Sequence, residues 1–321
     1  MIKAGIIGGA GYTAGELIRI LINHPDADIA FVQSSSNAGN AVTDVHTDLI
    51  GETDLQFLEG PDVHEADVLF LCMGHGRSKS YVEKLPKSYK GKIIDLSNDF
   101  RLKKDAGDFV YGLPELQRDK IKTASHIANP GCFATAIQLA LLPIASAKML
   151  SEVHIHAVTG STGAGQSPSQ TTHFSWRSSN MSVYKAFSHQ HLGEIGETLQ
   201  KLQPGFNDGV NFVPVRGDFP RGIMASVYMD LNLPEEIAAK LFRNYYSTHP
   251  FTHVTDKGPD LKMVVNTNKA VLHIKKYGNK IHIISMIDNL LKGASGQAVQ
   301  NMNLIFGLDE LTGLHLKPLA F

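Results

Sequence analysis

The sequence predicts a two-part α/β protein, in which a doubly wound parallel sheet is followed by an α+β region whose sheet is mainly antiparallel. Its 321 residues are about twice the usual length of one domain. In the first part short apolar segments alternate with helical ones, whereas after about residue 150 strand-like segments follow one another closely. Hydrophobic residues make up 43% of the chain, which is enough for a packed core and excludes a disordered protein.

The first part opens with a buried strand at residues 2–7, followed by a glycine-rich turn and a helical run at residues 16–22. Pro25 ends this helix, because the residue before a proline avoids helical geometry. Further strands are predicted in order at residues 28–33, 67–72 and 92–96. Strands that alternate with helices in this way form a parallel sheet with helices on both faces.

The second part consists mostly of strands. They are predicted at residues 153–158, 210–215, 223–231, 263–266, 271–276 and 280–287. Tyr277-Gly278-Asn279 is expected to form the hairpin turn between the last two. Helical periodicity is found at residues 234–246 and again at residues 296–306.

Charge and cysteine content exclude several classes of protein. Lys and Arg number 30 and Asp and Glu number 31, so a dedicated surface for nucleic acid or anionic membrane is not expected. The two cysteines form neither a disulfide framework nor a zinc pattern, which favours a reducing compartment. No apolar run reaches the ~20 residues of a membrane span, and the N-terminal segment reads as a buried strand rather than a leader. We therefore expect a cytoplasmic protein.

The glycine-rich turn predicts a Rossmann-type dinucleotide site. Gly8-x-x-Gly11-x-x-Ala14 lies between the first strand and the first helix, which is the context such a site requires. Gly8 allows the tight turn, Gly11 lets the backbone approach a pyrophosphate, and the N-terminus of the helix that follows faces the phosphates. Tyr12 and Thr13 of the same turn are also expected to contact the cofactor. The alternative is a glycine turn that only packs.

The end of the second strand indicates which dinucleotide binds. Sites for NAD usually carry an acidic residue there, but this strand ends in Ser34, Ser35 and Ser36. Three hydroxyls can bind a 2′-phosphate and no carboxylate repels it, which favours NADP, the alternative being an ordinary polar loop. Gly74 follows the next strand and is expected to line the same site.

Cys132 carries the strongest chemical signal. It follows Asn129-Pro130-Gly131 and precedes a run of good helix formers, so it is predicted to begin a helix. Exposed amides and the helix dipole favour a thiolate there, and a thiolate can form a thioester with an acyl substrate. Cys72 lies in an apolar strand and is expected to be an inert core thiol.

A proton acceptor for this thiol is sought among the histidines. His189 and His191 could form a metal pair, as could His154 and His156, but no acidic or cysteine ligands stand at supporting spacing, so no metal is expected. One histidine of the first pair as general base is the sharper interpretation, with Glu194 orienting it as in a nucleophile–base–carboxylate triad.

Seven stretches, in order along the whole chain, resemble the N-acetyl-gamma-glutamyl-phosphate reductases of arginine biosynthesis. They are GGAGYTAGEL (8–17), IDLSNDFRL (94–102), YGLPEL (111–116), ANPGCFAT (128–135), HQHLGEI (189–195), PRGI (220–223) and DNLLKGASGQAVQNMNLIFGLDELT (288–312, in part). ANPGC together with DN-x-x-KG-x-x-GQAVQNMN is highly specific.

The resemblance implies a fold like that of aspartate-semialdehyde and glyceraldehyde-phosphate dehydrogenases. Residues 1–147 would bind NADP, completed by a C-terminal helix within 294–321, and residues 148–293 would form the catalytic and oligomerisation domain of a homodimer or homotetramer. The implied reaction is the NADPH-dependent reduction of a small-molecule substrate, an N-acyl-gamma-glutamyl phosphate, through a Cys132 thioester. The acyl group would be acetyl, with succinyl as the alternative.

The resemblance also assigns residues. Cys132 falls on the nucleophile and His189 on the catalytic base, with Glu194 and Tyr184 at supporting positions. Asn289 is expected near the nicotinamide. Arg101 and Arg221 are the candidates for binding the phosphate and the α-carboxylate of the substrate, in either order, and Asn129 is also expected to bind substrate.

Three features depart from the family pattern. Ser36-Asn37 replaces an arginine carried by many members, Ala14 stands where glycine is common, and residues 161–180 are unlike the commoner pattern. The rival interpretations are an aspartate-semialdehyde dehydrogenase and an inactive NADP-sensing protein on the same scaffold.

Overall fold

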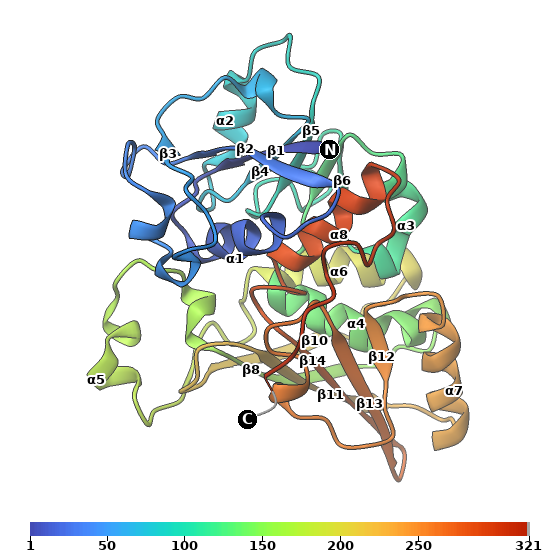
Figure 1. Cartoon of the computed structure of the whole chain (residues 1–321). Coiled ribbons are helices and arrows are strands. Elements are labelled where there is room, and N and C mark those ends of the chain that lie inside the picture. Colours follow the sequence, from blue (N-terminus) through green and yellow to red (C-terminus); the bar gives the residue numbers. More distant parts are fainter. Residues whose placement is uncertain (320–321) are drawn as a thin grey trace. The chain divides into compact units, whose positions relative to one another are not determined.

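The computed structural model describes residues 1–319, which divide into two compact units (Figure 1). Unit 1 comprises residues 1–130 and 294–315, and unit 2 comprises residues 131–293 and the chain from Leu316 onward. The sequence placed the first boundary after residue 147. The observed division comes earlier because the helix that begins at Cys132 packs against the sheet of unit 2.

Unit 1 contains a parallel sheet in the strand order β3-β2-β1-β4-β5-β7-β6. The predicted strands are β1 (Ile2–Ile7), β2 (Ala27–Gln33), β4 (Val68–Leu71) and β5 (Lys92–Asp95). Three strands of two or three residues were not predicted, since they are too short to show a period: β3 (Phe57–Leu58), β6 (Phe109–Tyr111) and β7 (His126–Ala128). The strand order reverses between β1 and β4, where sheets of this type bind their ligands.

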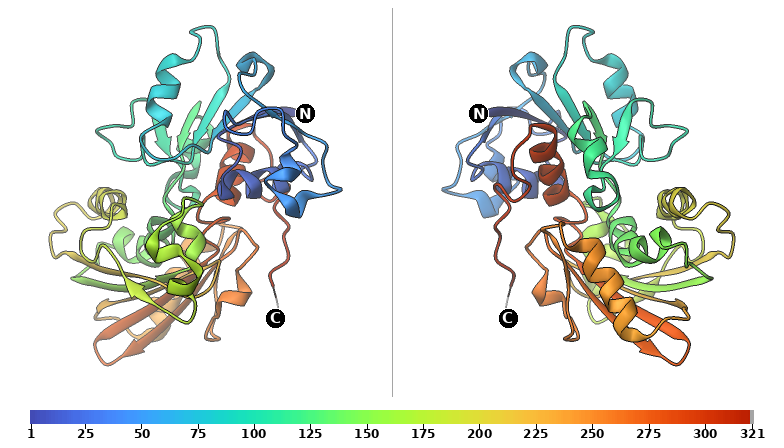
Figure 2. Two further views of the ribbon diagram at one scale, coloured as in Figure 1. Left: turned by 90° about the vertical axis from the view of Figure 1, so that its left-hand side faces the viewer. Right: turned by 90° about the vertical axis from the view of Figure 1, so that its right-hand side faces the viewer.

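The helices of unit 1 complete a doubly wound layer structure. They are α1 (Tyr12–Leu21), α2 (Ser78–Lys84), α3 (Pro114–Lys122) and α8 (Ser295–Ile305), with the 3₁₀ turns η1 (Val42–Asp44), η2 (Thr47–Leu49) and η3 (Val63–Glu65). Helix α8 returns from the far end of the chain, packs against α1 and α3, and is buried along its whole length (Figures 1 and 2). The expected C-terminal helix corresponds to α8, unit 1 ends at His315, and residues 316–319 belong to unit 2. Residues 320 and 321 lie outside the described part of the chain.

Unit 2 contains a mixed, mostly antiparallel sheet in the order β12-β13-β14-β11-β8-β10-β9. Its strands are β8 (Val153–Thr159), β9 (Ser182–Val183), β10 (Val210–Arg216), β11 (Ile223–Asp230), β12 (Thr252–Val254), β13 (Ala270–Tyr277) and β14 (Lys280–Ile287). The pairs β8–β10 and β12–β13 are parallel and the other pairs are antiparallel. The predicted hairpin is present, with Gly278 in the left-handed region at φ 58°.

One predicted strand, 263–266, is wrong. This segment leaves the 3₁₀ turn η6 (Leu261–Met263) and bends at Asn266, whose φ is +70°. Its apolar residues mimic a strand because Val264 packs into a small core with Val271 and Met286, not because the backbone is extended.

The helices of unit 2 are α4 (Cys132–Ser146), α5 (Phe174–Arg177), α6 (His191–Leu202) and α7 (Glu235–Tyr246), with the turns η4 (Ser161–Ala164) and η5 (Gln170–Thr172). Helix α4 contacts α6, α7 and strands β11, β13 and β14 (Figure 2). Residues 133–145 of α4 are all buried, because an almost entirely apolar helix must be covered on every side. Within the described residues no helix is long and apolar enough to cross a membrane.

Candidate active site

The glycine turn of unit 1 has the geometry of a dinucleotide site. Gly8 has a φ of +82°, and an added Cβ there would lie 3.1 Å from the carbonyl of Cys72, so only glycine fits without strain. Gly11 is the N-cap of α1, and an added Cβ at Gly11 would meet nothing within 4 Å. The first turn of α1, with Tyr12 and Thr13, therefore begins beside open backbone that a pyrophosphate can approach.

The loop after β2 presents a cluster of hydroxyls. Asn37 Nδ2 donates to Ser34 Oγ at 3.2 Å and to Ser36 Oγ at 3.0 Å, and Ser35 Oγ accepts from Gln33 Nε2 at 3.0 Å. Gln33 also accepts, through its backbone carbonyl, hydrogen bonds from the glycine turn at Gly8 (3.1 Å). The hydroxyls are thus tied to the end of β2, directly beside the glycine turn.

A second glycine segment follows β4. Gly74 is exposed, and the chain just after it is held by Asp99, which accepts hydrogen bonds from the N–H groups of Gly76 (2.6 Å) and Lys79 (3.1 Å). Sequence reasoning had not singled out Asp99, although it stands in the IDLSNDFRL stretch at the end of β5. Its carboxylate caps the start of α2 and fixes the Gly74 segment.

The two substrate candidates of unit 1 are both well anchored. Arg101 is buried and donates to the carbonyls of Asn129 (2.8 Å) and Leu96 (3.0 Å). The Asn129 side chain donates to Ala294 O at 3.0 Å and accepts from Asn301 Nδ2 at 3.1 Å. Asn129 therefore joins the end of β7 to α8 within unit 1.

Cys132 is the first residue of α4, as predicted, and Gly131 is the N-cap with extended geometry. Behind the cysteine stands Gly293, where an added Cβ would lie 2.8 Å from Cys132 Cβ. This contact explains the glycine of the KG pair, because any side chain there would displace the cysteine.

His189 lies in a ring of aromatic side chains beside α4. Its imidazole meets the rings of Phe133, Phe212 and Tyr184 edge to face, with centroids 5.5 to 5.7 Å apart. Its Nδ1 accepts a hydrogen bond from the His191 N–H at 3.2 Å, so the neutral ring carries its proton on Nε2.

Burial and positive neighbours keep His189 neutral. Burial, followed by the charges of Lys185 and Arg216, lowers the pKa of His189 to about 4. The turn that carries the ring is strained, since Lys185 and Phe187 both have positive φ angles, of 46° and 57°.

Burial, reinforced by the charge of a Cys132 thiolate, raises the pKa of Tyr184 to about 12, so its phenol is protonated. The electrostatic coupling of Tyr184 to Cys132 is consistent with the cysteine, histidine and tyrosine forming one cluster in unit 2.

Glu194 was expected to orient one histidine of the His189–His191 pair. Its Oε2 accepts a hydrogen bond from the Gly131 N–H at 3.0 Å, and its Oε1 lies 3.8 Å from His191 Nε2. The side chains of Glu194 and His191 are buried, and Gly131 is the N-cap of α4. The carboxylate therefore anchors Gly131, the residue that precedes Cys132.

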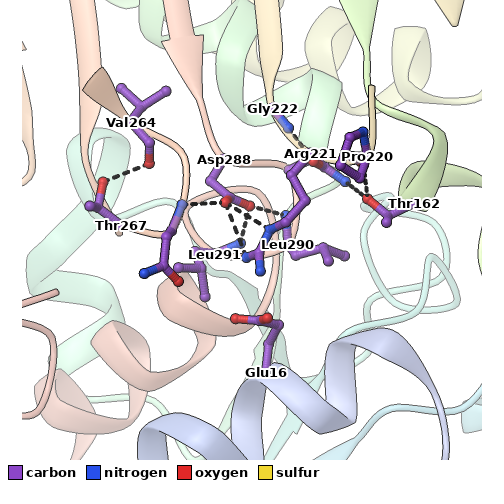
Figure 3. Close-up of polar contacts among 12 residues, drawn as sticks. Glu16, Thr162, Pro220, Arg221, Gly222, Val264, Thr267, Asp288, Leu290 and Leu291 are labelled. Carbon is purple, nitrogen blue, oxygen red and sulfur yellow. Dashed lines mark hydrogen bonds and ion pairs between the residues drawn. The ribbon is translucent and has the colours of Figure 1, made fainter. Parts of the chain in front are cut away.

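Arg221 is paired with a buried carboxylate, Asp288 (Figure 3). Asp288 Oδ2 lies 3.1 Å from Arg221 Nε and 3.0 Å from Nη2, and it also accepts from the Asn266 N–H at 2.7 Å. Its Oδ1 accepts from the N–H groups of Leu290 (2.8 Å) and Leu291 (3.2 Å). Asp288 thus joins Arg221 to the turn that leads to Gly293 and Cys132.

Asn289 follows in the same turn and uses both ends of its amide inside unit 2. Its Oδ1 accepts from the Gly222 N–H at 2.7 Å, and its Nδ2 donates to Thr162 Oγ1 at 3.0 Å. These bonds tie β14 to the segment that carries Arg221.

Sequence reasoning missed Asp288 and Arg216 as functional candidates. Asp288 had a signal, because it opens the specific DN-x-x-KG stretch, whereas Arg216 lies in a strand with no motif. The histidine pairs carry no metal signal: His154 stacks on Tyr228, and among residues 1–319 no group of three His, Cys, Asp or Glu side chains could hold an ion.

Comparison with known proteins matches these two units to two family models. Residues 3–124 match the NAD binding domain of semialdehyde dehydrogenases, and residues 132–289 match the semialdehyde dehydrogenase dimerisation domain. Among solved structures, aspartate semialdehyde dehydrogenase II of Vibrio cholerae covers 96% of this chain and 98% of its own, with a TM-score of 0.75 and 16% identity. The enzyme of Candida albicans, solved with NADP, gives a TM-score of 0.73 at 15% identity, covering 95% of this chain and 98% of its own. These likenesses establish the fold.

Sequence relatives establish the family. N-acetyl-gamma-glutamyl-phosphate reductase of Azobacteroides pseudotrichonymphae is 61% identical and that of Parabacteroides distasonis is 58% identical, each over the full length of both chains. The predicted resemblance and fold class are confirmed. With its match to an NAD binding domain followed by a semialdehyde dehydrogenase dimerisation domain, the chain belongs to the N-acetyl-gamma-glutamyl-phosphate reductases, an oxidoreductase family of the semialdehyde dehydrogenase fold.

Proposed function

We propose that this protein uses NADPH to reduce an N-acyl-gamma-glutamyl phosphate to the N-acylglutamate semialdehyde with release of phosphate. The observation that carries the proposal lies in unit 2, where Cys132 begins α4 and the ring of Tyr184, which is electrostatically coupled to Cys132, packs against His189. The full-length identity to relatives that carry this name supports the substrate class.

Cys132 is the nucleophile of the proposed reaction. The amides of the first turn of α4 and the helix dipole favour its thiolate. The sulfur attacks the carbonyl carbon of the acyl phosphate, the carbon–oxygen bond to phosphate breaks, and a thioester remains on Cys132. When bound, the reduced nicotinamide supplies the hydride that converts this thioester to the aldehyde level. The carbon–sulfur bond then breaks, which returns the thiolate and releases the semialdehyde.

His189 stabilises the oxygen that becomes negative in both steps. With Nδ1 occupied by the His191 N–H, its Nε2–H is the group available to donate a hydrogen bond. A neutral imidazole that donates is a weaker acid than an imidazolium, so it binds the oxyanion without losing its proton. Glu194, through Gly131, keeps the sulfur at its place on α4.

The cofactor site of unit 1 fits a dinucleotide with a 2′-phosphate. The open flank of Gly11 admits the pyrophosphate, and Ser34, Ser35 and Ser36 supply hydroxyl donors where NAD sites carry an acid. We therefore assign NADP rather than NAD, with Gly8, Tyr12, Thr13 and Gly74 lining the site. In this proposal Arg101 and Asn129 support the substrate side, and Asn289 the nicotinamide side.

The remaining proposals follow from the family. Unit 1 would be the NADP-binding domain and unit 2 the catalytic domain of a cytoplasmic homodimer or homotetramer in arginine biosynthesis. The description of the matching model as a dimerisation domain supports self-association through residues 132–289.

The test is the reverse reaction, phosphate-dependent oxidation of aldehydes with NADP. We expect rapid turnover with N-acetylglutamate semialdehyde, slower turnover with the N-succinyl compound, and none with aspartate semialdehyde. NAD should replace NADP poorly. Preference for aspartate semialdehyde would assign the protein to the rival dehydrogenase, and binding of NADP without turnover of any aldehyde would assign it to a sensor.

A further inference from the structure

Arg216 ends β10 beside the catalytic cluster of unit 2, and no motif pointed to it. It pairs with Ser182 of β9, and Tyr184 follows directly after that strand. The Arg216 guanidinium carbon lies 4.6 Å from the centre of the Tyr184 ring, and the same ring meets His189 at 5.7 Å. A guanidinium stacked on a ring keeps its edge, where the N–H groups lie, free to point at a planar anion.

The charge of Arg216 has no carboxylate partner in the described part of the chain, which sets it apart from Arg221. Arg221 is paired with the buried Asp288, so much of its charge is already neutralised. Arg216 is half-buried, and its Nε is shielded from solvent without a hydrogen-bond partner among residues 1–319. A shielded donor without a partner is costly, and a bound anion would satisfy it.

The neighbours of Arg216 add positive charge. Lys185 lies beside His189, and Arg177 approaches from the 161–180 segment, where its Nη1 donates to Arg216 O at 2.8 Å. The guanidinium of Arg177 is used on carbonyls, including Thr171 O at 3.1 Å from Nη2, so it supports the backbone of Arg216. The nearby carboxylate of Asp218 partly compensates the positive charge of Arg177, and it accepts a hydrogen bond from the Ser179 N–H.

We propose that Arg216 binds an anionic group of the substrate, either the phosphoryl group or the α-carboxylate, next to Cys132. This inference rests on the proposed function, since an N-acyl-gamma-glutamyl phosphate carries both groups. A cation at this place would hold the substrate carbonyl against the sulfur and stabilise phosphate as it leaves.

The experiment replaces Arg216 and measures each substrate separately in the reverse reaction. In Arg216→Met the KM for phosphate, or the KM for the semialdehyde, should rise about ten- to a hundredfold, because a charge-assisted hydrogen bond is lost. Arg216→Lys should recover part of the loss, and the KM for NADP should stay within about twofold. The KM that changes identifies the anion. The matched control is Arg243→Met, which removes an exposed arginine of α7 that pairs with Asp256.

A second measurement does not depend on turnover. Inorganic phosphate or N-acetylglutamate should protect Cys132 from iodoacetamide in the natural protein and should protect it less in Arg216→Met. Unchanged KM values together with unchanged protection would overturn the role of Arg216 while leaving the proposed function intact. Protection that depends on Arg216, in a protein that oxidises no N-acylglutamate semialdehyde, would overturn the proposed function and leave the anion site. If the methionine variant does not fold, Arg216→Gln carries the same comparison.

Discussion

The two cysteines of this protein stand in similar sequence surroundings, and we propose opposite chemistry for them. Cys72 comes directly after β4 and enters a glycine segment, and Cys132 follows β7 by four residues and begins α4 after a glycine. Cys72 is enclosed at the tight turn of Gly8, its N–H donating to Ile7 O at 2.8 Å, and burial raises the pKa of its thiol to about 12. Cys132 instead begins α4, and its charge acts on Tyr184. A thiol becomes a nucleophile through its surroundings rather than through its place after a strand.

The largest effect should come from exchanging each thiol for a hydroxyl. Cys132→Ser is expected to lower the rate by at least about a thousandfold while NADPH still binds, because the thioester cannot form. Cys72→Ser should keep activity within a few-fold and lose some stability. Rates and NADPH fluorescence check both variants, and iodoacetamide labelling read by mass spectrometry should modify Cys132 before Cys72. Reductase activity retained in Cys132→Ser would remove the sulfur from the mechanism.

The second prediction concerns the imidazole that accompanies only one of the two thiols. His189→Asn should lower the rate by about 10²–10⁴, since the oxyanion loses its donor. Because the pKa of His189 is about 4, the natural protein should show no loss of kcat near pH 6.5 from this group. His156→Asn, an exposed histidine of β8, is the matched control. An acid limb near pH 6.5 that disappears in His189→Asn would contradict the neutral donor.

The same group makes stability depend on pH. The unfolded chain binds a proton at about pH 6.5, whereas folded His189 binds one only near pH 4, so stability is lost as pH falls through this window. The loss attributable to His189 is about 3 kcal/mol, and it should be missing in His189→Asn. Urea unfolding at pH 7 and pH 4.5 measures the difference between the two proteins.

The smallest of the effects should come from Asp288, the buried carboxylate that pairs with Arg221. Asp288→Asn places an amide N–H₂ or an unpaired oxygen against Arg221 and the Asn266 N–H, both of which are donors. We expect kcat/KM to fall about ten- to a hundredfold. If Asp288 acts through Arg221, the effects of Asp288→Asn and Arg221→Met should not add. Asp230→Asn, an exposed carboxylate paired with Lys280, is the control, and strict additivity would argue for a purely structural role.

Much of the fold could be predicted from local pattern. Sequence analysis predicted the strands β1, β2, β4 and β5, the glycine turn, and the start of α4 at Cys132. Each of these depends on hydrophobic periodicity or on a residue that favours one particular backbone geometry. The short strands β3, β6 and β7 were missed, and the strand at 263–266 was wrong. In each case partners distant in the chain decide whether a few residues pair or turn.

The site divides in the same way. The residue types and their order indicated Cys132, the histidine pair and the serine loop, since their chemistry is a property of the side chain and its immediate neighbours. Only the tertiary structure decided that Glu194 binds the Gly131 N–H, that Asp288 neutralises Arg221, and that Arg216 lies over Tyr184 without a carboxylate of its own. Charges are neutralised and protons are shared through space over a few ångströms, and the spacing of residues along a chain does not specify those distances.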